Sequence, residues 1–371
     1  MALSSPLQSA LLRYQKDIDA ALHQAVFVPE AEAAATGGLA SFYGQMQYHL
    51  GWVDSDFQPS RHNPGKLLRP TLLLFAYEAA GAWGQVPTSE QDHDYLRRAL
   101  PAAAAIELTH NFTLIHDDIE DHDTERRHRA TMWHIWGIPQ AINTGDGMFA
   151  LARYTLWGVL EAGVESAIAA QLGRILDHAC LILAEGQHLD MSFEQMLHIP
   201  VSSYIDMISR KTGALMRCAA EMGARLGTRD EETIQRLRSF GWAMGIAFQV
   251  RDDILGVWAS TAELGKTPAG DLYRRKKSLP ILHALEHAAP AAQARLRALY
   301  SQPTPLTVTE VQEILAILEQ TRTRAYCHAF LSEQCHTAYE ALTQVPHNDN
   351  PLSLRALRDM QAMVEFVEET V

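Results

Sequence analysis

The run LIHDDIEDHDTERRHR, residues 114–129, concentrates acidic side chains at the end of an apolar segment. Six carboxylates lie within nine residues, and three arginines follow them. Like charges at this density repel one another unless a counter-charge is bound. A divalent cation supplies that charge, and hard cations such as Mg²⁺ prefer oxygen ligands. The run therefore predicts a site for metal ions and phosphate, with the arginines holding phosphate oxygens through forked hydrogen bonds.

A second aspartate-rich segment, GIAFQVRDDILG, covers residues 245–256. It places Gln249 about one helical turn before Asp252 and Asp253 on another apolar stretch. Metal ions that bridge a diphosphate need ligands from two sides, so two such helix ends in one chain are a stronger signal than either alone. By itself, the first run could also be a solvated acidic helix end, and the second segment is what favours the metal site.

The elements that carry both segments have helical periodicity. Helices are predicted over residues 98–118, 166–196, 203–227, 231–257, 278–299 and 308–343. Pro70, Pro101 and Pro280 stand near helix starts, where a missing N–H costs little. No strand pattern of useful length and no linker occur. The prediction is an all-α bundle of ten or more helices in one domain, residues 1–371.

The helix that leads into the first run is apolar on nearly every side, which is typical of the centre of a bundle. At 100° per residue, Glu107, His110, Asp117 and Asp121 fall within about 80° of one another. Asp117 and Asp121 are one turn apart, with Cβ atoms roughly 5–6 Å from each other. Alone, one of this pair is pushed toward protonation, whereas a bound cation keeps both ionised.

Composition and charge exclude several classes of protein. The formal net charge of −13 argues against a nucleic-acid partner, which needs clustered Lys and Arg. No signal peptide and no apolar window of eighteen residues are evident, so a cytoplasmic protein without a membrane span is expected. Four cysteines without metal-like spacing fit buried thiols in a reducing compartment. The GKT at 265–267 is no P-loop, because Ser260 stands where the motif needs glycine.

Basic residues lie in three further segments that could hold phosphate. They are Lys66 and Arg69 in GKLLRP (65–70), Lys211 beside Thr212 in SRKTG (209–213), and Lys266, Lys276 and Lys277 together with Asp271 in residues 264–280.

From about Gly65 to Pro280 these motifs resemble those of the all-trans isoprenyl diphosphate synthases, or polyprenyl synthetases. DDIED (117–121) is similar to the family's first aspartate-rich motif, and FQVRDDILG (248–256) to its second. GKLLRP, EGQHLD (185–190) and KTG (211–213) occur in the family's order. The resemblance implies mostly antiparallel helices around a deep central cavity, and a homodimer. It also implies head-to-tail joining of isopentenyl diphosphate to an allylic diphosphate. The reaction is expected to use three Mg²⁺ ions, which Mn²⁺ could replace.

The resemblance also assigns roles to residues. Metal ligation, direct or through water, falls to Asp117, Asp118, Asp121, Asp252 and Asp253. The allylic diphosphate is assigned to Arg126, Lys211, Gln249 and Lys266. Isopentenyl diphosphate is assigned to Gly65, Lys66, Arg69, His110 and Arg127. Thr212 and Gln249 are expected to line the reacting carbons, and Gln187 and Asp190 to lie near the metal ions.

Three positions depart from the family pattern: Gly256 where a third aspartate is frequent, Leu67 where arginine is common, and Ala130 in place of a proline. Gly256 raises the question of weaker metal binding at the second motif.

Product length in the family follows cavity depth below the first motif. Phe112 and Thr113, the fifth and fourth residues before Asp117, resemble the pattern of geranylgeranyl (C20) synthases, with farnesyl (C15) as the alternative. A helical wheel puts Phe112 about 140° from Asp117, so this role rests on the resemblance alone.

Two other functions remain open. A class I terpene cyclase shares an aspartate-rich motif and an α-bundle, but it normally carries an Asn/Asp–Ser–Glu metal triad where this chain has FQVRDD. It also has no need of Lys66, Arg69 and Arg127 for a second diphosphate. A non-catalytic subunit of a hetero-oligomeric synthase usually lacks aspartates from one motif, and this chain keeps them.

Overall fold

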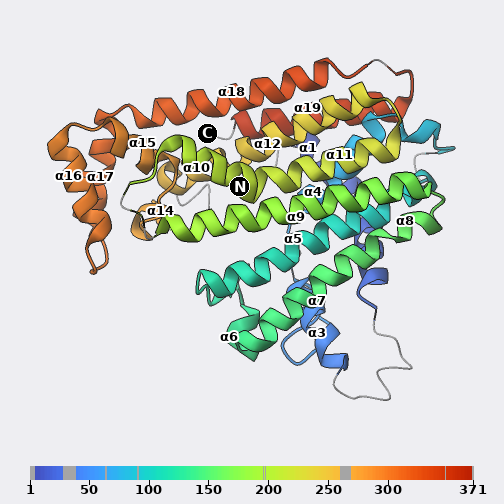
Figure 1. Ribbon diagram of the computed structural model, residues 1–371, viewed down its shortest axis with the longest axis horizontal. Helices are drawn as coiled ribbons and strands as arrows, with labels where there is room; N and C mark the ends of the chain where they lie inside the picture. The colour runs from blue at the N-terminus through green and yellow to red at the C-terminus, as the bar shows by residue number, and fades with distance from the viewer. Residues whose placement is uncertain are drawn as a thin grey trace.

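The computed structural model describes residues 5–27, 39–62, 65–89, 92–194, 196, 198–259, 269–346 and 348–369. These residues form a bundle of helices, which confirms the all-α fold with ten or more helices (Figure 1). Extended pairing within them is confined to a hairpin of β1 (Glu125–Arg126) and β2 (Arg129–Ala130), and to a bridge between Val53 and Pro59. The sequence pattern gave no sign of the hairpin, because each of its strands has only two residues.

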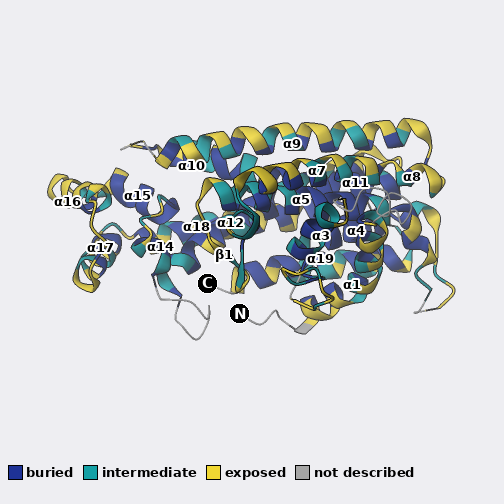
Figure 2. Cartoon of the chain, turned by 90° about the horizontal axis from the view of Figure 1, so that it is seen from below, coloured by how far each residue is buried: buried dark blue, intermediate teal, exposed yellow. Residues whose placement is uncertain are grey.

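Four helices form the centre of the bundle. They are α4 (Leu68–Ala79), α5 (Leu100–Glu120), α11 (Ala214–Gly227) and α12 (Glu231–Trp258). Most of their residues are buried, and α11 packs along both α4 and α12 (Figure 2). Helices that are apolar on all sides have to be covered by others, which is why further helices surround these four.

The outer helices complete the bundle. In chain order they are α1 (Ser5–Ala25), α3 (Leu39–His49), η1 (Ala82–Gly84), η2 (Asp94–Arg98), α6 (Met132–Trp136), α7 (Ile138–Leu156), α8 (Gly158–Glu161), α9 (Ser166–Glu194), α10 (Val201–Ile208), η3 (Ser209–Gly213), α14 (Gly270–Tyr273), α15 (Leu279–His287), α16 (Pro290–Ser301), α17 (Val308–Gln320), α18 (Thr323–Thr343) and α19 (Pro351–Glu369).

Two predicted helices are each two helices in the structure. Residues 278–299 break between α15 and α16, where Ala288 and Ala289 are extended ahead of Pro290. The helical conformation is disfavoured for a residue that precedes proline, because the proline ring clashes with its backbone. This explains the break. Residues 308–343 break between α17 and α18, where Arg322 takes a left-handed φ of 52°. The Thr321 hydroxyl also donates to the carbonyls of Ile317 and Leu318, which ends α17.

One helix of the described residues, α9, is long and apolar enough to cross a membrane by length and composition alone. Every eighteen-residue window of α9 contains charged residues, among them Arg174, Asp177 and Glu185, so α9 does not contradict the expectation that no uncharged apolar window of that length occurs. Only 28% of its most apolar window is buried, and one side of the helix is exposed along the outside of the bundle (Figure 2). Its other side packs on α11 and η3, where it carries polar residues of the site described below.

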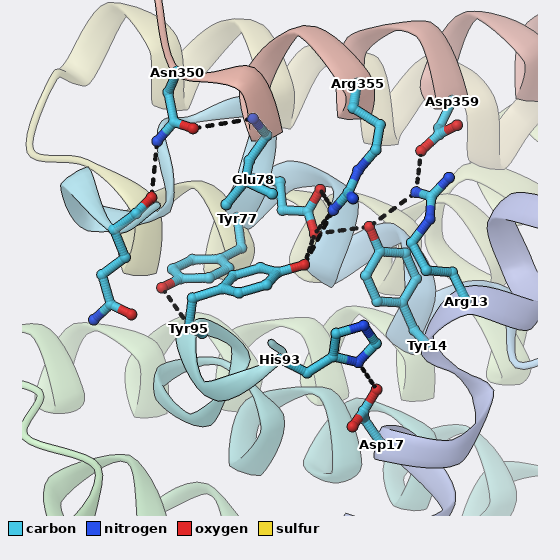
Figure 3. A network of polar contacts seen from close by, with 12 residues as sticks. Arg13, Tyr14, Asp17, Tyr77, Glu78, His93, Tyr95, Asn350, Arg355 and Asp359 are labelled. Atoms are coloured by element: carbon cyan, nitrogen blue, oxygen red, sulfur yellow. Dashed lines mark hydrogen bonds and ion pairs between the residues drawn. The ribbon is translucent and has the colours of Figure 1, made fainter. Parts of the chain in front are cut away.

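A buried polar network fastens the two ends of the chain to α4 (Figure 3). At its centre is the fully buried carboxylate of Glu78, which accepts hydrogen bonds from the hydroxyls of Tyr14 (2.7 Å) and Tyr95 (2.8 Å). Arg355 of α19 lies 2.9 Å from both carboxylate oxygens. Because these groups come from α1, α4, η2 and α19, the network fixes how the first and last helices lie against the centre.

We expect Arg355→Met to lower the free energy of unfolding by about 3 kcal/mol, because it leaves the Glu78 carboxylate buried without its cation. Arg358→Met, on an exposed turn of the same helix, should change stability by less than about 0.5 kcal/mol. Urea denaturation of both variants measures the difference. Equal losses in the two would mean that the buried pair does not stabilise the fold.

Candidate active site

A cavity of about 780 Å³ opens between α5, α9, η3, α12 and α14. Many of the residues that the sequence singles out line it, although they are far apart in the chain. They are Arg69, His110, Phe112, Thr113, Asp117, Arg126, Gln187, Lys211, Thr212, Gln249, Asp252, Asp271 and Lys276. Both aspartate-rich segments therefore face one space, as the sequence predicts.

Asp117 is the aspartate of the first segment that lines the cavity, and Glu120 of the same segment lines it as well. The Asp117 side chain is only 17% exposed, and burial raises the pKa of Asp117 to about 6 although the Lys211 ammonium, 3.8 Å away, lowers it. Lys211 also donates to Asp190 at 2.7 Å, which holds the ammonium at the cavity wall. Asp121 caps the end of α5, is exposed, and stands beyond the cavity lining. A carboxylate whose ionised form is disfavoured by burial is well placed to gain from a bound cation.

Lys211 lies in η3, a single π-helical turn between α10 and α11. Such turns are rare and are frequent at functional sites. The backbone here approaches α9 closely, since a Cβ at Gly186 would stand 2.4 Å from the backbone nitrogen of Lys211. Glycine in the EGQHLD segment thus lets η3 bring Lys211 against the acidic end of α5.

Asp118 points away from the cavity and holds Arg126. Its side chain is 2% exposed and accepts a hydrogen bond of 2.6 Å from the Arg126 Nε. Burial raises the pKa of Asp118 to about 6, and the Arg126 cation opposes that rise. This placement favours a role in orienting Arg126 over direct contact with a metal ion.

The hairpin that carries Arg126 turns through Arg127 and His128, both with positive φ (52° and 61°). Two-residue hairpin turns of this kind usually hold glycine or asparagine, because other residues are strained there. Strain of this type is concentrated at functional sites. Here the turn brings Arg127 so close to Gly65 that a Cβ at position 65 would stand 2.8 Å from the Arg127 guanidinium.

The two aspartates of the second segment, like Asp117 and Asp118 of the first, have different surroundings. Asp252 lines the cavity, whereas Asp253 is fully buried behind it. Asp253 accepts hydrogen bonds from Tyr204 (2.5 Å) and Gln249 (3.2 Å). Gln249 in turn accepts from the Thr212 hydroxyl at 3.0 Å. Asp253 thereby orients the Gln249 amide, and its own oxygens are occupied by protein donors.

Asp271 of α14 explains the glycine at the end of the second segment. A Cβ at Gly256 would stand 2.2 Å from the Asp271 Oδ2, so the Asp271 carboxylate occupies the space that a side chain at 256 would need. Asp271 lines the cavity and pairs with Arg274 at 2.8 Å. The sequence shows Asp271 only as an acidic residue among lysines, and the contact with Gly256 is visible only in the fold.

The residues assigned to the second diphosphate also come together. Arg69 donates to the His110 Nε2 at 3.1 Å, and burial, followed by the Arg69 cation, holds the pKa of His110 well below its usual range. His110 is therefore neutral and accepts this bond. Glu107, one turn earlier, is 3% exposed, and burial raises its pKa although Arg69 and Arg127 lower it. Arg69, His110 and Arg127 thus form one cluster around a single buried carboxylate.

Two lysines of residues 264–280 have different surroundings. Lys276 lines the cavity 3.8 Å from Asp253. Lys277 donates to the carbonyls of Phe193, Glu194 and Met196, so it caps the end of α9. Lys266, which the sequence assigns to the allylic diphosphate, lies outside the described residues.

Comparison with known proteins decides the family. Residues 52–318 match the family model described as Polyprenyl synthetase. The chain is 33% identical to a geranylgeranyl diphosphate synthase of Mycobacterium tuberculosis over 96% of its own length and 95% of the relative's. It is 36% identical to a (2E,6E)-farnesyl diphosphate synthase of the same species over 74% and 71% of the two chains. A polyprenyl synthetase structure from Streptomyces coelicolor superposes with a TM-score of 0.80 at 32% identity, covering 99% of both chains.

The chain belongs to the polyprenyl synthetase family. It is accordingly a prenyltransferase.

The resemblance assigns product length to two residues of α5, Phe112 and Thr113. Phe112 and Thr113 both line the cavity, as does Asp117. The helical wheel failed to place Phe112 there because the cavity wraps around α5, so residues well apart on the wheel reach it. The Phe112 ring packs edge-on against Phe149 of α7, with centroids 5.1 Å apart, at the boundary to a second hollow of about 450 Å³.

Cys180 of α9 stands at the same boundary, lining both hollows. Burial raises its pKa to about 11, so it is a neutral thiol. The other three cysteines, Cys218, Cys327 and Cys335, are buried and free, as the sequence predicts.

The donors of the cavity fit the divalent ions that polyprenyl synthetases use. Among the described residues, no three His, Cys, Asp or Glu side chains stand together as a metal cage. Asp117 and Asp252 instead present carboxylates from two different helices. Mg²⁺ usually takes one or two protein carboxylates and completes its shell with water and phosphate oxygens. Gln187 and Asp190 of α9 lie beside the same end of α5, where Gln187 donates to Glu120 at 2.5 Å.

Proposed function

We propose that this chain joins isopentenyl diphosphate head-to-tail to an allylic diphosphate, with Mg²⁺, and that its product is C20 geranylgeranyl diphosphate. The observation that carries the proposal is one cavity faced by Asp117 and Asp252, which Arg69 and His110 also line as part of a second cationic cluster with Arg127. Two diphosphates need two cationic sites, which a terpene cyclase does not. The similarity to synthases named for C20 and C15 products supports the same reaction.

Different residues of the cavity have different roles in the proposed reaction. Lys211 and Arg126, each held by a carboxylate, hold the allylic diphosphate by charge-assisted hydrogen bonds. Asp117 and Asp252 would hold Mg²⁺, which would supply charge that stabilises the leaving pyrophosphate. The Thr212–Gln249 pair presents polar atoms toward the reacting carbons.

The rest of the cavity protects the allylic carbocation that remains. Leu183, Leu215 and Leu255 line the same space and exclude water, which would otherwise quench the cation before the double bond of isopentenyl diphosphate attacks it. The proton lost from the new chain is assigned to the released pyrophosphate, a base that the reaction itself leaves in the cavity.

A product assay tests the reaction and the chain length together. Purified protein with Mg²⁺ and isopentenyl diphosphate is given dimethylallyl, geranyl or farnesyl diphosphate, and the product is read by mass spectrometry. We expect a C20 diphosphate, no elongation with excess chelator, and recovery when Mg²⁺ is added back. A C15 end product would overturn the chain length alone.

Two other outcomes would overturn the reaction. Hydrocarbons formed from farnesyl or geranylgeranyl diphosphate without isopentenyl diphosphate would identify a cyclase. An inactive protein that stimulates a partner synthase would identify a non-catalytic subunit.

We also propose that the chain acts as a homodimer through α7 and α9. These helices pack together, and large apolar side chains on them are exposed, among them Ile142, Tyr154 and Leu181. Exposed apolar side chains on two helices that pack together favour an interaction site there. The proposal predicts twice the chain mass in sedimentation equilibrium, and the mass of a single chain would contradict it.

A further inference from the structure

The last helix, α19, packs antiparallel along α4, and this places its end beside the start of α4. Near one end of the pair, Arg355 of α19 bonds Glu78 of α4 (Figure 3). Eleven residues farther along α19 is Phe366, and twelve residues back along the chain from Glu78 is Lys66. Eleven helical residues span about 16 Å, so the anchor at Arg355 sets where Phe366 lies relative to Lys66.

The Phe366 ring faces two cations from different parts of the chain. The Lys66 Nζ lies 5.8 Å from the ring centroid, and the Arg251 Cζ lies 4.7 Å from it. Both distances are within the range of cation–π attraction. Phe366 is 5% exposed and Arg251 is also 5% exposed, whereas Lys66 is exposed to solvent. A buried ring thus restrains a lysine that otherwise has a long, flexible side chain.

Each of these two cations is close along the chain to a residue that lines the cavity, Lys66 to Arg69 and Arg251 to Asp252. Lys66 lies two residues before α4, whose first turn carries Arg69, and Arg251 directly precedes Asp252, whose carboxylate is 3.4 Å away. Burial, and then the charge of Arg251, lower the pKa of Lys66. The Asp252 carboxylate opposes this and raises the pKa of Lys66, so two cations share one carboxylate here and a further anion would balance their charge.

We propose that Phe366 is a positioning residue for isopentenyl diphosphate, because its ring holds Lys66 and Arg251 toward that substrate's diphosphate. The inference rests on the proposed function for the identity of the substrate. It gives the C-terminal helix a part in binding one substrate and not the other: Lys211 and Arg126, which hold the allylic diphosphate, are fixed by Asp190 and Asp118 and do not depend on α19.

The test compares Phe366→Leu, which removes the ring, with Phe366→Tyr, which keeps it. We expect Phe366→Leu to raise the KM for isopentenyl diphosphate about fivefold or more, and to change the KM for the allylic diphosphate by less than about twofold. Phe366→Tyr should stay close to the wild type in both. Phe366→Met gives a second variant without the ring, in case leucine packs poorly.

Val367→Ala is the matched control, since Val367 is the next residue of α19 and is fully buried. It should lower the thermal midpoint as Phe366→Leu does, without the selective rise in KM. Equal rises for both substrates, an unchanged KM in Phe366→Leu, or the same rise in Val367→Ala would overturn the proposal.

Failure of the proposed function has a different signature, because the wild type would then elongate no primer. In that event, calorimetric titration of wild type and Phe366→Leu with isopentenyl diphosphate still decides the inference. Weaker binding by the variant supports it. Equal affinity, or no binding by either protein, overturns it.

Discussion

Asp117→Asn is expected to lower kcat/KM for the condensation by more than about a hundredfold. The Asp117 carboxylate lines the same cavity as Asp252, and an amide at position 117 cannot offer Mg²⁺ the same negative charge. Loss of a group that only orients a metal ligand typically costs 10–100-fold, so loss of a ligand itself should cost more. Because the change weakens metal binding, raising Mg²⁺ should restore part of the activity.

Steady-state rates across a series of Mg²⁺ concentrations measure this effect. Asp123→Asn is the control, because Asp123 lies in the same charged run but is exposed and outside the cavity lining. It should keep activity within about twofold. A loss in Asp123→Asn as large as in Asp117→Asn would show that the net charge of the run, and not the cavity-facing carboxylate, is what matters.

Phe112→Ala is expected to lengthen the main product by at least one five-carbon unit. The Phe112 ring stands between the cavity of about 780 Å³ and the second hollow of about 450 Å³. Removing it should join the two spaces, so that a growing chain reaches farther before it meets a wall. Mass spectrometry of products made from geranyl diphosphate measures the change.

Phe149→Ala distinguishes the contribution of the Phe149 ring from that of the Phe112 ring at this boundary. It leaves Phe112 in place, so the product should keep the wild-type length, whereas the double variant should exceed Phe112→Ala alone. An active Phe112→Ala enzyme with an unchanged product would show that the cavity ends elsewhere.

Local patterns in the sequence predicted most of the secondary structure. Pro101 and Pro280 lie in the first turns of α5 and α15, and apolar periodicity gave α5, α9 and α12 to within two residues. These features depend on neighbours three or four residues away, which a sequence displays directly. The breaks at Ala288 and Arg322 were missed, because the apolar pattern continues through both and gives no sign of the extended or left-handed backbone there.

The sequence by itself determined which residue types gather in this protein: two aspartate-rich helix ends, with lysines and arginines in fixed order. Only the tertiary structure decided which of them face one another. Asp117 and Asp252 meet the cavity while their neighbours Asp118 and Asp253 hold Arg126 and Gln249. Helical period gives the angle between side chains on one helix, but not which side a partner helix covers.

The same reason applies to the contacts between distant segments. Asp271 fills the space beside Gly256, Phe112 reaches a cavity that wraps around its helix, and Phe366 meets Lys66 across some 300 residues of chain. Each contact depends on how helices pack, which many side chains set together and no short motif records.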